Sequence, residues 1–586
     1  MPIKLEKGNN LDNIRHSLSH LLAAAVLKKF PKAKLGIGPV IEDGFYYDFL
    51  LPRSLTPEDL KEIEAIMRTY IKEEIPFSGK KITGVEAKKV FRDQPFKLEL
   101  INELSKTKEP ISIYKTGDIF LDLCRGGHVK NTKEIPADGF KLNKIAGAYW
   151  RGSEKNPMLQ RIYGLAFNTK AELAEYTKLL EEAKKRDHRK LGQELDLFTF
   201  SDLVGAGLPL WTPKGTLLRN LLDDFVWQLR KARGYEKVEI PHITKKDLYE
   251  RSGHWEKFKD DLFRIKTREG HEFAMKPMNC PHHTQIYARR QWSYRELPQR
   301  YENTTMVYRD EQSGELSGLA RVLSITQDDA HVFCRIAQAK EEFLKIWDIV
   351  HEFYSAFGLN LRARLSLHDP AHMEKYLGNA KRWAFAEKIL REIVTEKEGE
   401  WFEGVGEAAF YGPKLDFMAK DSLGREWQVA TIQIDMNMPE RFDLFCIDER
   451  GERERIVMIH AAIMGSIERY LSILIEHFAG AFPLWLSPVQ ATILPVGEKF
   501  EKYAKKTLKE FEERGIRTEL SDANETLGKR IRESELQKIP YVLVVGEKEE
   551  NNKTVNVRHY KQGQIGEIGI EKLLEKIKTE ILEKTI

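Results

Sequence analysis

The sequence contains little cysteine, no long apolar run and almost no net charge. Four cysteines stand far apart in 586 residues, which excludes a disulfide-rich scaffold and makes a reducing cytoplasm the expected location. The most apolar stretch, residues 470–486, is interrupted by Glu476 and His477, so no membrane span is expected. The first seven residues have no apolar core, and we therefore expect no signal peptide.

The composition is that of an ordinary globular chain with several domains. Lysine and arginine number 94 and aspartate and glutamate 90, and the net charge of +4 permits nucleic-acid binding without arguing for it. Hydrophobic residues make up 41% and the mean hydropathy is −0.48, which leaves enough apolar material for several cores. The length predicts about three to five domains.

The hydrophobic pattern first changes near residue 195. Residues 1–185 mix helical and strand patterns, with a helix expected over residues 11–30 and a strand over residues 44–49. The charged run 181–190 is predicted to be a linker helix that ends at about residue 195. A solvated helix face and a nucleic-acid contact are the two interpretations of this run.

A second region, residues 196–485, combines one long helix with many strands. Leucines at helical spacing predict a long amphipathic helix after Pro213, which Gly234 ends. Few helices separate the strand patterns that follow, which favours an antiparallel sheet. The expected strands cover residues 237–240, 304–309, 321–326, 414–418 and 427–434.

In the third region, residues 486–586, strands and helices alternate as in a small α/β domain. Strands are expected over residues 491–495, 517–520 and 541–545, and helices over residues 499–513 and 526–537.

Two pairs of residues in the first region could form one site. His16 and His20 are four residues apart, so both imidazoles lie on one face of a helix. Cys124 and His128 supply a thiol and a third imidazole. The four side chains could hold zinc, or they could form a metal-free hydrolytic pocket in which imidazoles position water. For the histidine pair alone, two surface residues are the simpler interpretation.

The second region contains three further clusters. Cys280, His282 and His283 suggest a metal, although this cluster alone is ambiguous. Arg309 is followed by Glu311, which would share its face in a strand, and an arginine fork suits a phosphate. A surface ion-pair ladder is the alternative. The cluster continues with Arg321, Gln327, Asp329 and His331.

The last cluster is an apolar segment, residues 458–469, which we predict to be a helix. It carries His460 and Arg469. Because a buried arginine is rare without a partner, an anionic ligand is one interpretation, and a capping or ion-paired arginine is the other.

In this order and at these separations, the clusters resemble those of the bacterial threonyl-tRNA synthetases, a family of class II aminoacyl-tRNA synthetases. The resemblance runs from about Leu11 to the end of the chain. Its most specific motifs are Asn-Cys-Pro at 279–281, Gln-Asp-Asp-Ala-His at 327–331 and Phe-Tyr-Gly-Pro-Lys at 410–414, together with the paired His16/His20 and Cys124/His128.

The resemblance implies an α+β multidomain fold and a ligase activity. It assigns an N-terminal α+β editing domain to residues 1–185, a class II catalytic domain with an antiparallel sheet to 196–485, and an α/β anticodon-binding domain to 486–586. The implied partners are ATP with Mg²⁺, L-threonine and tRNA(Thr), and the implied assembly is a cytoplasmic homodimer. The helix after Pro213 would build the dimer interface, although it could equally be buried within one subunit.

The resemblance also implies a role for each site residue. Cys280, His331 and His460 would hold one Zn²⁺, whose open position receives the amino group and hydroxyl of threonine. The residues implied in catalysis are Arg309, Arg321, Arg469, His254 and Lys414. Those implied in binding ATP or threonine are Glu311, Gln327, Asp329, Tyr411, Gln428, Thr431, Gln433, Ser466 and Met278. Editing is assigned, without a metal, to His16, His20, Cys124, His128 and Asp122, and anticodon recognition to Asn524, Glu549 and Arg558.

The chemistry of threonine explains why two sites are expected. A metal that needs a hydroxyl rejects valine, but serine differs only by a missing methyl, which is worth about 1–3 kcal/mol. Binding alone therefore cannot exclude serine, and a separate hydrolytic site is the expected solution.

Some positions depart from the family pattern, and two other functions remain open. The family's usual small N-terminal domain is expected to be absent, and Gly127, His282, Leu323, Ile325 and Ala461 replace the usual residues. Another class II enzyme, such as a seryl or prolyl synthetase, is one alternative, against which the cysteine–histidine set argues. A catalytically inactive paralogue that senses tRNA or amino acid is the other. The retained Arg309, Arg321 and Arg469 argue against it.

Overall fold

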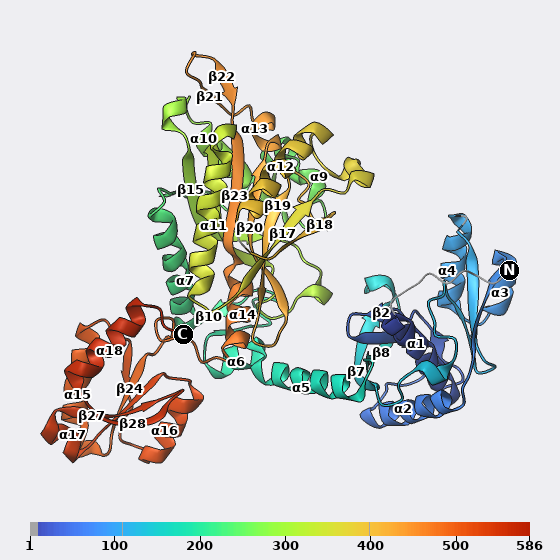
Figure 1. Cartoon of the computed structure of the whole chain (residues 1–586), viewed down its shortest axis with the longest axis horizontal. Coiled ribbons are helices and arrows are strands. Elements are labelled where there is room, and N and C mark those ends of the chain that lie inside the picture. The colour runs from blue at the N-terminus through green and yellow to red at the C-terminus, as the bar shows by residue number, and fades with distance from the viewer. Residues whose placement is uncertain (1–9, 108, 398) are drawn as a thin grey trace. The chain divides into compact units, whose positions relative to one another are not determined.

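The computed structural model describes residues 10–107, 109–397 and 399–586. These divide after Glu181 into two compact units, which Figure 1 shows with the elements labelled. In the described residues, none of the helices combines the length and apolar composition that crossing a membrane requires. Residues 1–9, where the sequence predicts no signal peptide, lie outside the described part of the chain.

The first unit packs helices on two small sheets. One sheet has the order β1-β3-β8-β7, with β2 beside β3, and the other has the order β4-β5-β6. Helix α1 is buried around most of its circumference because its middle reads Leu-Leu-Ala-Ala-Ala-Val. The elements are α1 (Asn10–Lys29), β1 (Lys34–Leu35), β2 (Val40–Ile41), β3 (Gly44–Leu50), α2 (Pro57–Lys72), β4 (Phe77–Ile82), α3 (Gly84–Val90), α4 (Pro95–Lys106), β5 (Ile111–Thr116), β6 (Phe120–Leu123), β7 (Phe140–Tyr149) and β8 (Met158–Ala166). The helix over residues 11–30 and the strand over residues 44–49 are confirmed.

The charged run forms helix α5 (Lys170–Arg186), which crosses the division between the units, and helix α6 (His188–Glu194). His188 of α6 is buried, whereas the other residues of the charged run 181–190 are not. Its Nδ1 lies 2.6 Å from a carboxylate oxygen of Glu476, and its Nε2 accepts a hydrogen bond of 3.1 Å from the backbone N–H of Leu319. The histidine therefore ties α6 to the loop that precedes β16.

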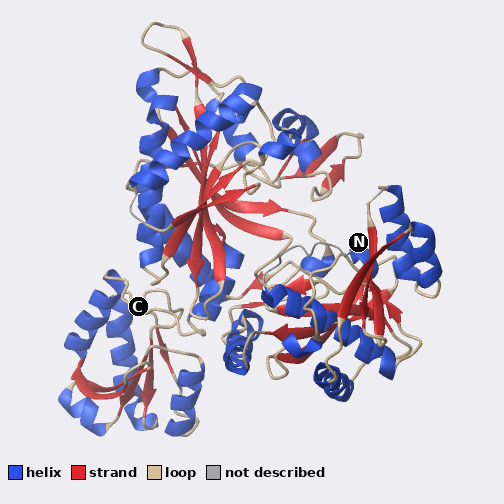
Figure 2. Cartoon of the chain, turned by 45° about the vertical axis from the view of Figure 1, so that its right-hand side comes forward, coloured by secondary structure: helices blue, strands red, loops and turns tan. Residues whose placement is uncertain are grey.

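The second unit is organised around an eight-stranded sheet, which fans out in Figure 2. Its order is β11-β15-β16-β23-β20-β19-β17-β18. The strands are β11 (Glu236–Lys237), β15 (Gln299–Tyr308), β16 (Ser324–Cys334), β17 (Leu361–Leu367), β18 (Trp401–Val405), β19 (Lys414–Lys420), β20 (Glu426–Asp435) and β23 (Val457–Ser466). The predicted antiparallel sheet is confirmed for its central strands, whereas the edge pairs β11–β15 and β17–β18 are parallel.

Four helices bury one face of this sheet. They are α7 (Pro213–Lys231), α11 (Ala339–Ser355), α12 (Ala380–Glu396) and α14 (Ile467–His477). Their apolar side chains form one core with alternate residues of the strands, such as Ala330, Ile432 and Ile459. The predicted helix after Pro213 is confirmed, and its apolar face is buried within this chain.

Smaller elements surround the sheet. They are β9 (Phe198–Thr199), β10 (Leu210–Trp211), β12 (Ile243–Lys245), α8 (Lys246–Ser252), α9 (His254–Lys257), β13 (Arg264–Lys266), β14 (Glu272–Met275), α10 (Cys280–Tyr287), α13 (Asn437–Arg441), β21 (Phe445–Ile447) and β22 (Arg453–Arg455).

The prediction of a helix over residues 458–469 is wrong. Residues up to Ser466 form strand β23, and helix α14 begins only at Ile467. Strand β23 lies between β16 and β20 and packs against apolar residues on both faces, so its sequence is a continuous apolar run. Such a run has no alternation by which a strand is distinguished from a buried helix.

Three strand predictions have wrong boundaries. Strand β16 covers Ser324–Cys334 rather than residues 321–326, and β15 covers Gln299–Tyr308 rather than residues 304–309. Strand β11 (Glu236–Lys237) shares only Lys237 with the strand expected over residues 237–240. In addition, β15 ends at Tyr308, so Arg309 and Glu311 lie in the loop after it and are not neighbours on one strand face.

The last hundred residues contain a five-stranded sheet of order β25-β24-β26-β27-β28, which confirms the α/β pattern. The predicted strands over residues 491–495 and 541–545 have the observed bounds. The elements are β24 (Ala491–Pro495), α15 (Glu501–Glu513), β25 (Thr518–Leu520), α16 (Leu527–Leu536), β26 (Tyr541–Val545), α17 (Glu547–Asn552), β27 (Thr554–His559), β28 (Gly563–Gly569) and α18 (Ile570–Leu582).

The start of α2 provides a test of the first unit. Asp59 and the N-cap Thr56 form a capping box, and Arg53 donates two hydrogen bonds of 2.6 and 2.8 Å to the Asp59 carboxylate. The arginine is the main cause that lowers the pKa of Asp59 below its ordinary value of 3.8. A carboxylate with a lowered pKa stabilises the fold above the unfolded-state pKa, and this stabilisation is lost as the pH falls through the folded-state pKa.

We predict that Asp59→Asn weakens α2 at pH 7 by about 1–2 kcal/mol, which is a roughly 5- to 30-fold loss of protection for its amide hydrogens. The difference from the wild type should shrink as the pH falls below 4. Hydrogen exchange of the α2 amides in the full chain, corrected for intrinsic rates at each pH, measures this. Glu58→Gln in the same turn is the control, and a difference that does not change with pH would contradict the prediction.

Candidate functional site

Alternation of side chains places most of the predicted site residues on one face of the large sheet. Residues 330 and 332 of β16 join the helix-covered core, so Asp329 and His331 point to the opposite face. The same alternation holds for β19, β20 and β23. Lys414, Thr431, Gln433 and His460 therefore also lie on this opposite face, away from core residues 415, 430, 432 and 459.

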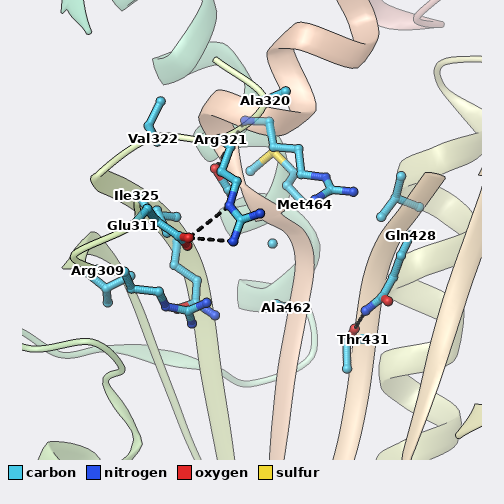
Figure 3. Close-up of a pocket in the computed structure, with 16 residues that line it drawn as sticks. Arg309, Glu311, Ala320, Arg321, Val322, Ile325, Gln428, Thr431, Ala462 and Met464 are labelled. Atoms are coloured by element: carbon cyan, nitrogen blue, oxygen red, sulfur yellow. Dashed lines mark hydrogen bonds and ion pairs between the residues drawn. The ribbon is translucent and has the colours of Figure 1, made fainter. Parts of the chain in front are cut away.

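A cavity of about 440 Å³ opens on this face, as Figure 3 shows. Eight of the residues expected to bind ATP or the amino acid line it. They are Arg309, Glu311, Arg321, Gln327, Gln428, Thr431, Ser466 and Arg469. The polar groups come from strands, loops and a helix that are far apart in the sequence, and a cavity with such convergent groups is typical of a small-molecule site.

The three arginines of the cavity fall into two electrostatic groups: desolvation by the surrounding protein lowers the pKa of Arg309 and of Arg469, whereas Arg321 is held in an ion pair that raises its pKa. Arg321 donates hydrogen bonds of 2.9 and 2.6 Å to one carboxylate oxygen of Glu311, drawn as dashed lines in Figure 3, and it also pairs with Glu315. The guanidinium of Arg309 lies over the ring of Phe258. Arg321 is thus part of an ion-pair ladder, which the sequence allowed as the alternative to a phosphate-binding site.

The expectation that Arg469 is a buried arginine is wrong. The residue is exposed at the first turn of α14, and its guanidinium lies 5.8 Å from the ring centre of Trp427. Its side chain belongs to the cavity lining because α14 begins at the edge of the cavity. An exposed guanidinium at a cavity edge remains available to an anionic ligand.

Next to the cavity residues, the sheet register assembles a metal-type cluster. His331 of β16 pairs directly with His460 of β23, and Cys280 is the first residue of α10. One donor atom from each of the three lies within 4.8 Å of the others, and all three residues are buried. His331 Nε2 is 3.0 Å from His460 Nδ1. A thiol and two imidazoles that converge in this way match a three-ligand zinc site.

Neighbouring side chains orient the two imidazoles. Asp435 lies 3.1 Å from His460 Nε2, which directs Nδ1 of that ring towards the cluster. His283 Nδ1 lies 2.8 Å from His331 Nδ1. Such outer partners set the tautomer and direction of metal-binding histidines. Sequence reasoning missed Asp435, whereas it named His283 in the cluster with Cys280 and His282 but gave it no role of its own.

The departure at His282 does not produce a competing ligand. His282 is buried against Tyr249, and neither of its ring nitrogens has a hydrogen-bond partner among the described residues. The cluster of Cys280, His331 and His460 does not include it. Its neighbour His283 makes the contact with His331 instead.

Other predicted substrate residues surround the cluster. Asp329 accepts a hydrogen bond of 3.0 Å from Asn279, and burial raises its pKa to about 6. The Tyr411 hydroxyl donates to Gln433 over 2.6 Å, and its ring lies 5.0 Å from that of His460. His254 is fully buried with Nε2 3.8 Å from Cys280 Sγ, and burial lowers its pKa to about 3.

Lys414 and Met278 complete this set. Lys414 donates a hydrogen bond of 2.7 Å to Asp416. Met278 precedes α10 and packs, half-buried, against the apolar cluster that contains Cys280. Lys414 is thus the one predicted residue of the synthetic site whose side chain neither lines the cavity nor contacts the side chains around the metal-type cluster in the described residues; it reaches the others through Asp416.

In the first unit the two predicted pairs come together. Cys124 Sγ lies 3.5 Å from His16 Nε2 and 3.3 Å from His128 Nε2, and the rings of His16 and His128 stack at 4.2 Å. The ring of His20 lies 4.2 Å from that of His128. Burial lowers the pKa of all three histidines and raises that of Cys124 to about 12. The pocket therefore holds neutral imidazoles and a neutral thiol.

Asp122 enters this pocket through partners that sequence reasoning missed. Its carboxylate pairs with Lys97 at 2.5 Å and accepts a hydrogen bond of 2.5 Å from the Tyr47 hydroxyl. All three side chains are almost fully buried. A buried lysine that is balanced by one carboxylate brings a positive charge to a pocket of neutral groups. Lys97 stood in no motif, and no sequence signal identified it.

Comparison with known proteins gives the family. The chain is 47% identical to the threonine–tRNA ligase of Thermosynechococcus vestitus over 583 residues, which cover 98% of this chain and 96% of that protein. It is 48% identical to the threonine–tRNA ligase of Thermus thermophilus, covering 98% of this chain and 89% of that protein. The chain belongs to the threonine–tRNA ligase family.

Family models and solved structures agree with this membership of the ligase family. Residues 263–478 match the class II tRNA synthetase core domain (G, H, P, S and T), residues 490–580 an anticodon binding domain, and residues 111–163 the threonyl and alanyl tRNA synthetase second additional domain. A crystal structure titled as the RNA binding domain of threonyl-tRNA synthetase from Cryptosporidium parvum is 37% identical, with TM-score 0.64 over 67% of this chain and 98% of that chain. A putative threonyl-tRNA synthetase of Aeropyrum pernix is 29% identical, with TM-score 0.60 over 68% and 97%.

In the anticodon-binding domain of this ligase-family chain, the three residues predicted to contact the anticodon differ in exposure and in hydrogen-bond or ion-pair partners. Asn524 is exposed in the loop between β25 and α16, whereas Arg558 of β27 forms an ion pair with Glu535 at 2.7 Å. Glu549 is buried, and its carboxylate accepts a hydrogen bond from the backbone N–H of Gly546 at the start of α17. A role in anticodon recognition stays a prediction for all three.

Two departures from the ligase-family pattern have a structural explanation. Gly127 stands where the family usually has proline, and its φ of +85° is one that proline cannot adopt and that other residues rarely adopt. Ala461 lies on the helix-covered face of β23, and its carbonyl accepts a hydrogen bond of 3.2 Å from Arg230 of α7. Ile325 lines the cavity with an aliphatic side chain, and Leu323 makes backbone hydrogen bonds with Arg309 and Gly207.

Proposed function

We propose that this chain activates L-threonine with ATP, transfers the threonyl group to tRNA(Thr) and hydrolyses Ser-tRNA(Thr) in its first unit. The observation that carries the proposal is the adjacency of two groups on one sheet face. These are a cavity with three arginines and the buried Cys280, His331 and His460 cluster. Membership of the threonine–tRNA ligase family supports the same activity.

In the synthetic site, ATP would enter as its Mg²⁺ complex with its phosphates beside Arg309 and Arg469. Arg321 would reach the phosphates after it exchanges Glu311 for them, because a phosphate competes for the same planar fork. Glu311, thereby freed, would accept from the adenine. Gln327 and Ser466, both in the cavity lining, would contact the amino acid end of the adenylate.

Cys280, His331 and His460 would hold Zn²⁺. Their donor set and the support of His460 by Asp435 fit this ion. Bound Zn²⁺ would supply a Lewis-acid position for the amino group and hydroxyl of threonine. Asp329, 3.7 Å from His331 Nε2, would accept from the amino group. Tyr411 and Gln433 close the pocket with a hydrogen bond between them.

In the hydrolytic pocket, the neutral imidazoles of His16, His20 and His128 would accept hydrogen bonds from a water molecule and orient it. One of them would take a proton as the water oxygen attacks the ester carbonyl, and would return it to the ribose oxygen that leaves. Burial keeps them unprotonated, so a lone pair is present at neutral pH. Lys97, held by Asp122, would face the negative charge that develops on the ester carbonyl. We assign no metal to this pocket.

We also propose the finer organisation that the resemblance implies. Residues 1–185 form the editing domain with its linker to about residue 195, residues 196–485 the catalytic domain and residues 486–586 the anticodon-binding domain of a cytoplasmic homodimer. The exposed apolar side chains of Leu203, Val204 and Leu210 support an interface in this chain. Asn524, Glu549 and Arg558 are the proposed contacts to anticodon bases, which are unstacked and read by such side chains.

We predict that the protein catalyses ATP–pyrophosphate exchange strongly with threonine, weakly with serine and not with valine or proline, and that chelation of zinc abolishes it. Cys280→Ala should lose both metal and exchange because a two-imidazole site binds zinc more weakly. Metal analysis and exchange on the same samples measure this. Cys446→Ala, a buried cysteine outside the cluster, is the matched control.

Three outcomes would contradict this proposal. Full exchange in a metal-free Cys280→Ala protein would exclude the zinc assignment. If none of the amino acids supported exchange, the result would instead favour an inactive paralogue that binds tRNA or amino acid as a regulator. Exchange with proline or serine but not threonine would favour another class II enzyme.

A second prediction concerns hydrolysis. His16→Ala combined with Cys124→Ala should leave Ser-tRNA(Thr) intact while threonylation of tRNA persists, because the altered residues belong to the first unit only. Deacylation of preformed Ser-tRNA and threonylation are measured in parallel, with Cys446→Ala again as control. Continued deacylation by the double variant would place the hydrolytic site elsewhere.

The aliphatic lining at Ile325 gives a third prediction. Ile325→Phe should lower the KM for ATP about two- to tenfold, since an aromatic pair adds roughly 0.5–1.5 kcal/mol beyond area burial. ATP titration of threonine-dependent exchange measures this. Ile325→Leu keeps the volume without a ring and should leave the KM unchanged. An unchanged or higher KM in Ile325→Phe would show that adenine does not stack at this position.

A further inference from the structure

A single carboxylate connects three of the side chains that the proposed synthetic site uses. Asp416 lies in the middle of β19 and is fully buried. In the sheet register it stands opposite Arg364 of β17 and Thr431 of β20. These three residues form one row across three strands, on the face that carries the cavity.

Five donors bind the two oxygens of Asp416. Oδ2 accepts hydrogen bonds from Arg364 at 2.9 Å, from Ser366 at 2.7 Å and from Lys414 at 2.7 Å. Oδ1 accepts from the side-chain amide of Gln428 and from the hydroxyl of Thr431, both at 2.8 Å. A carboxylate offers about four lone-pair sites. Asp416 is therefore saturated by the protein and does not itself bind a substrate.

A bulge in β20 is what brings Gln428 to this carboxylate. Gln428 and Thr431 are three residues apart, so in a regular strand they would point to opposite faces. The register of β20 against β19 shifts between the partners of Phe417 and Met418, which leaves Val429 as the extra residue. Val429 and Ala430 both face the helix-covered core, and Gln428 joins Thr431 on the cavity face.

The resulting contacts fix the edge of the cavity. Gln428 Nε2 also lies 3.2 Å from Thr431 Oγ1, the bond drawn between these residues in Figure 3. The other end of the same amide accepts from Arg364 at 2.8 Å. The direction of Gln428 is thereby determined at both ends, and Asp416 or one of its partners makes each contact.

Charge makes the position of Lys414 depend on Asp416. The ammonium group has three donors and directs one of them to Oδ2, where the guanidinium of Arg364 also binds. With the carboxylate ionised, the two cations share it. Arg364 has a second, more exposed partner in Glu407 at 3.4 Å, whereas Asp416 is the carboxylate that Lys414 contacts. Without the charge of Asp416 the two cations would repel each other over a short distance in a buried site, and the lysine would turn away from its present direction.

We propose that Asp416 is a positioning residue for the synthetic site: its carboxylate holds Lys414, Gln428 and Thr431 in the orientation in which they receive the reacting groups. This inference rests on the proposed function, because it assigns a role within that reaction. Lys414, with its other donors directed to substrate, would be the group through which Asp416 affects the chemical step.

The test is kinetic, on the full-length protein. Asp416→Asn keeps the shape and removes the charge, and it should lower kcat of threonine-dependent ATP–pyrophosphate exchange about 10- to 100-fold, the scale expected of a misplaced catalytic group. The KM for ATP should change less than kcat. In a Lys414→Ala background the same substitution should lower kcat less than about threefold, because the effects of two residues that act as a unit do not multiply.

Two further variants separate positioning from a loss of structure. Ser366→Ala removes one hydrogen bond from the same buried carboxylate, but Ser366 directs no group to the cavity, so kcat should fall less than about threefold. Asp416→Glu retains the charge and should recover part of the activity that Asp416→Asn loses. Should Asp416→Asn fail to give the wild-type unfolding transition, Asp416→Glu and Ser366→Ala still decide the question.

The outcomes distinguish this inference from the proposed function. A wild-type protein without threonine-dependent exchange contradicts the proposed function itself. A wild-type protein with exchange, together with an Asp416→Asn variant of unchanged kcat, contradicts only the role of Asp416. Multiplicative effects of Asp416→Asn and Lys414→Ala, or an equal loss in Ser366→Ala, also overturn it, whereas the predicted split of kcat from KM with non-multiplicative effects supports it.

Discussion

The alternation of side chains along the large sheet is the constraint on which both the core and the synthetic site depend. A slip of one residue would exchange the buried and the cavity-facing sets. The burial of Ala330, Val332 and Ile459 against α7 and α11 therefore fixes the register that places His331 opposite His460. The same apolar contacts therefore stabilise the fold and set the distance between the two imidazoles, and the start of α10 adds Cys280 to them.

The site also depends on two places where this alternation is broken. In β20 the extra residue at Val429 directs Gln428 to the cavity. In β23 the register shifts near Gly465, which has φ of +71°, and the backbone N–H groups of Ile463 and Met464 donate to the buried carboxylate of Asp328. Such bulges cost regular pairing but redirect side chains, and here they bring Gln428 and Ser466 to the cavity edge. The breaks in regularity thus lie where ligand groups are needed.

The sequence predicted the elements whose pattern is local and missed those that depend on distant partners. The alternation after residue 486 and the helix after Pro213 are visible in periodicity, and both are confirmed. Strand β23 was mistaken for a helix because a strand buried on both faces has no periodicity. The site clusters were predicted from family motifs. Lys97 lies in no motif, and only the folded chain brings it to Asp122.

The two proposed sites need opposite relations to water, which explains why one pocket cannot perform both reactions. An activated acyl group survives only where water is kept out, and the synthetic site is accordingly built on the sheet with buried ligands and a saturated Asp416. Hydrolysis needs a water molecule held by neutral groups that accept its hydrogen bonds. The buried imidazoles of His16, His20 and His128 have that character. Since a methyl group supplies at most about 1–3 kcal/mol of discrimination, accuracy for threonine requires both environments, and the chain places them in separately folded units.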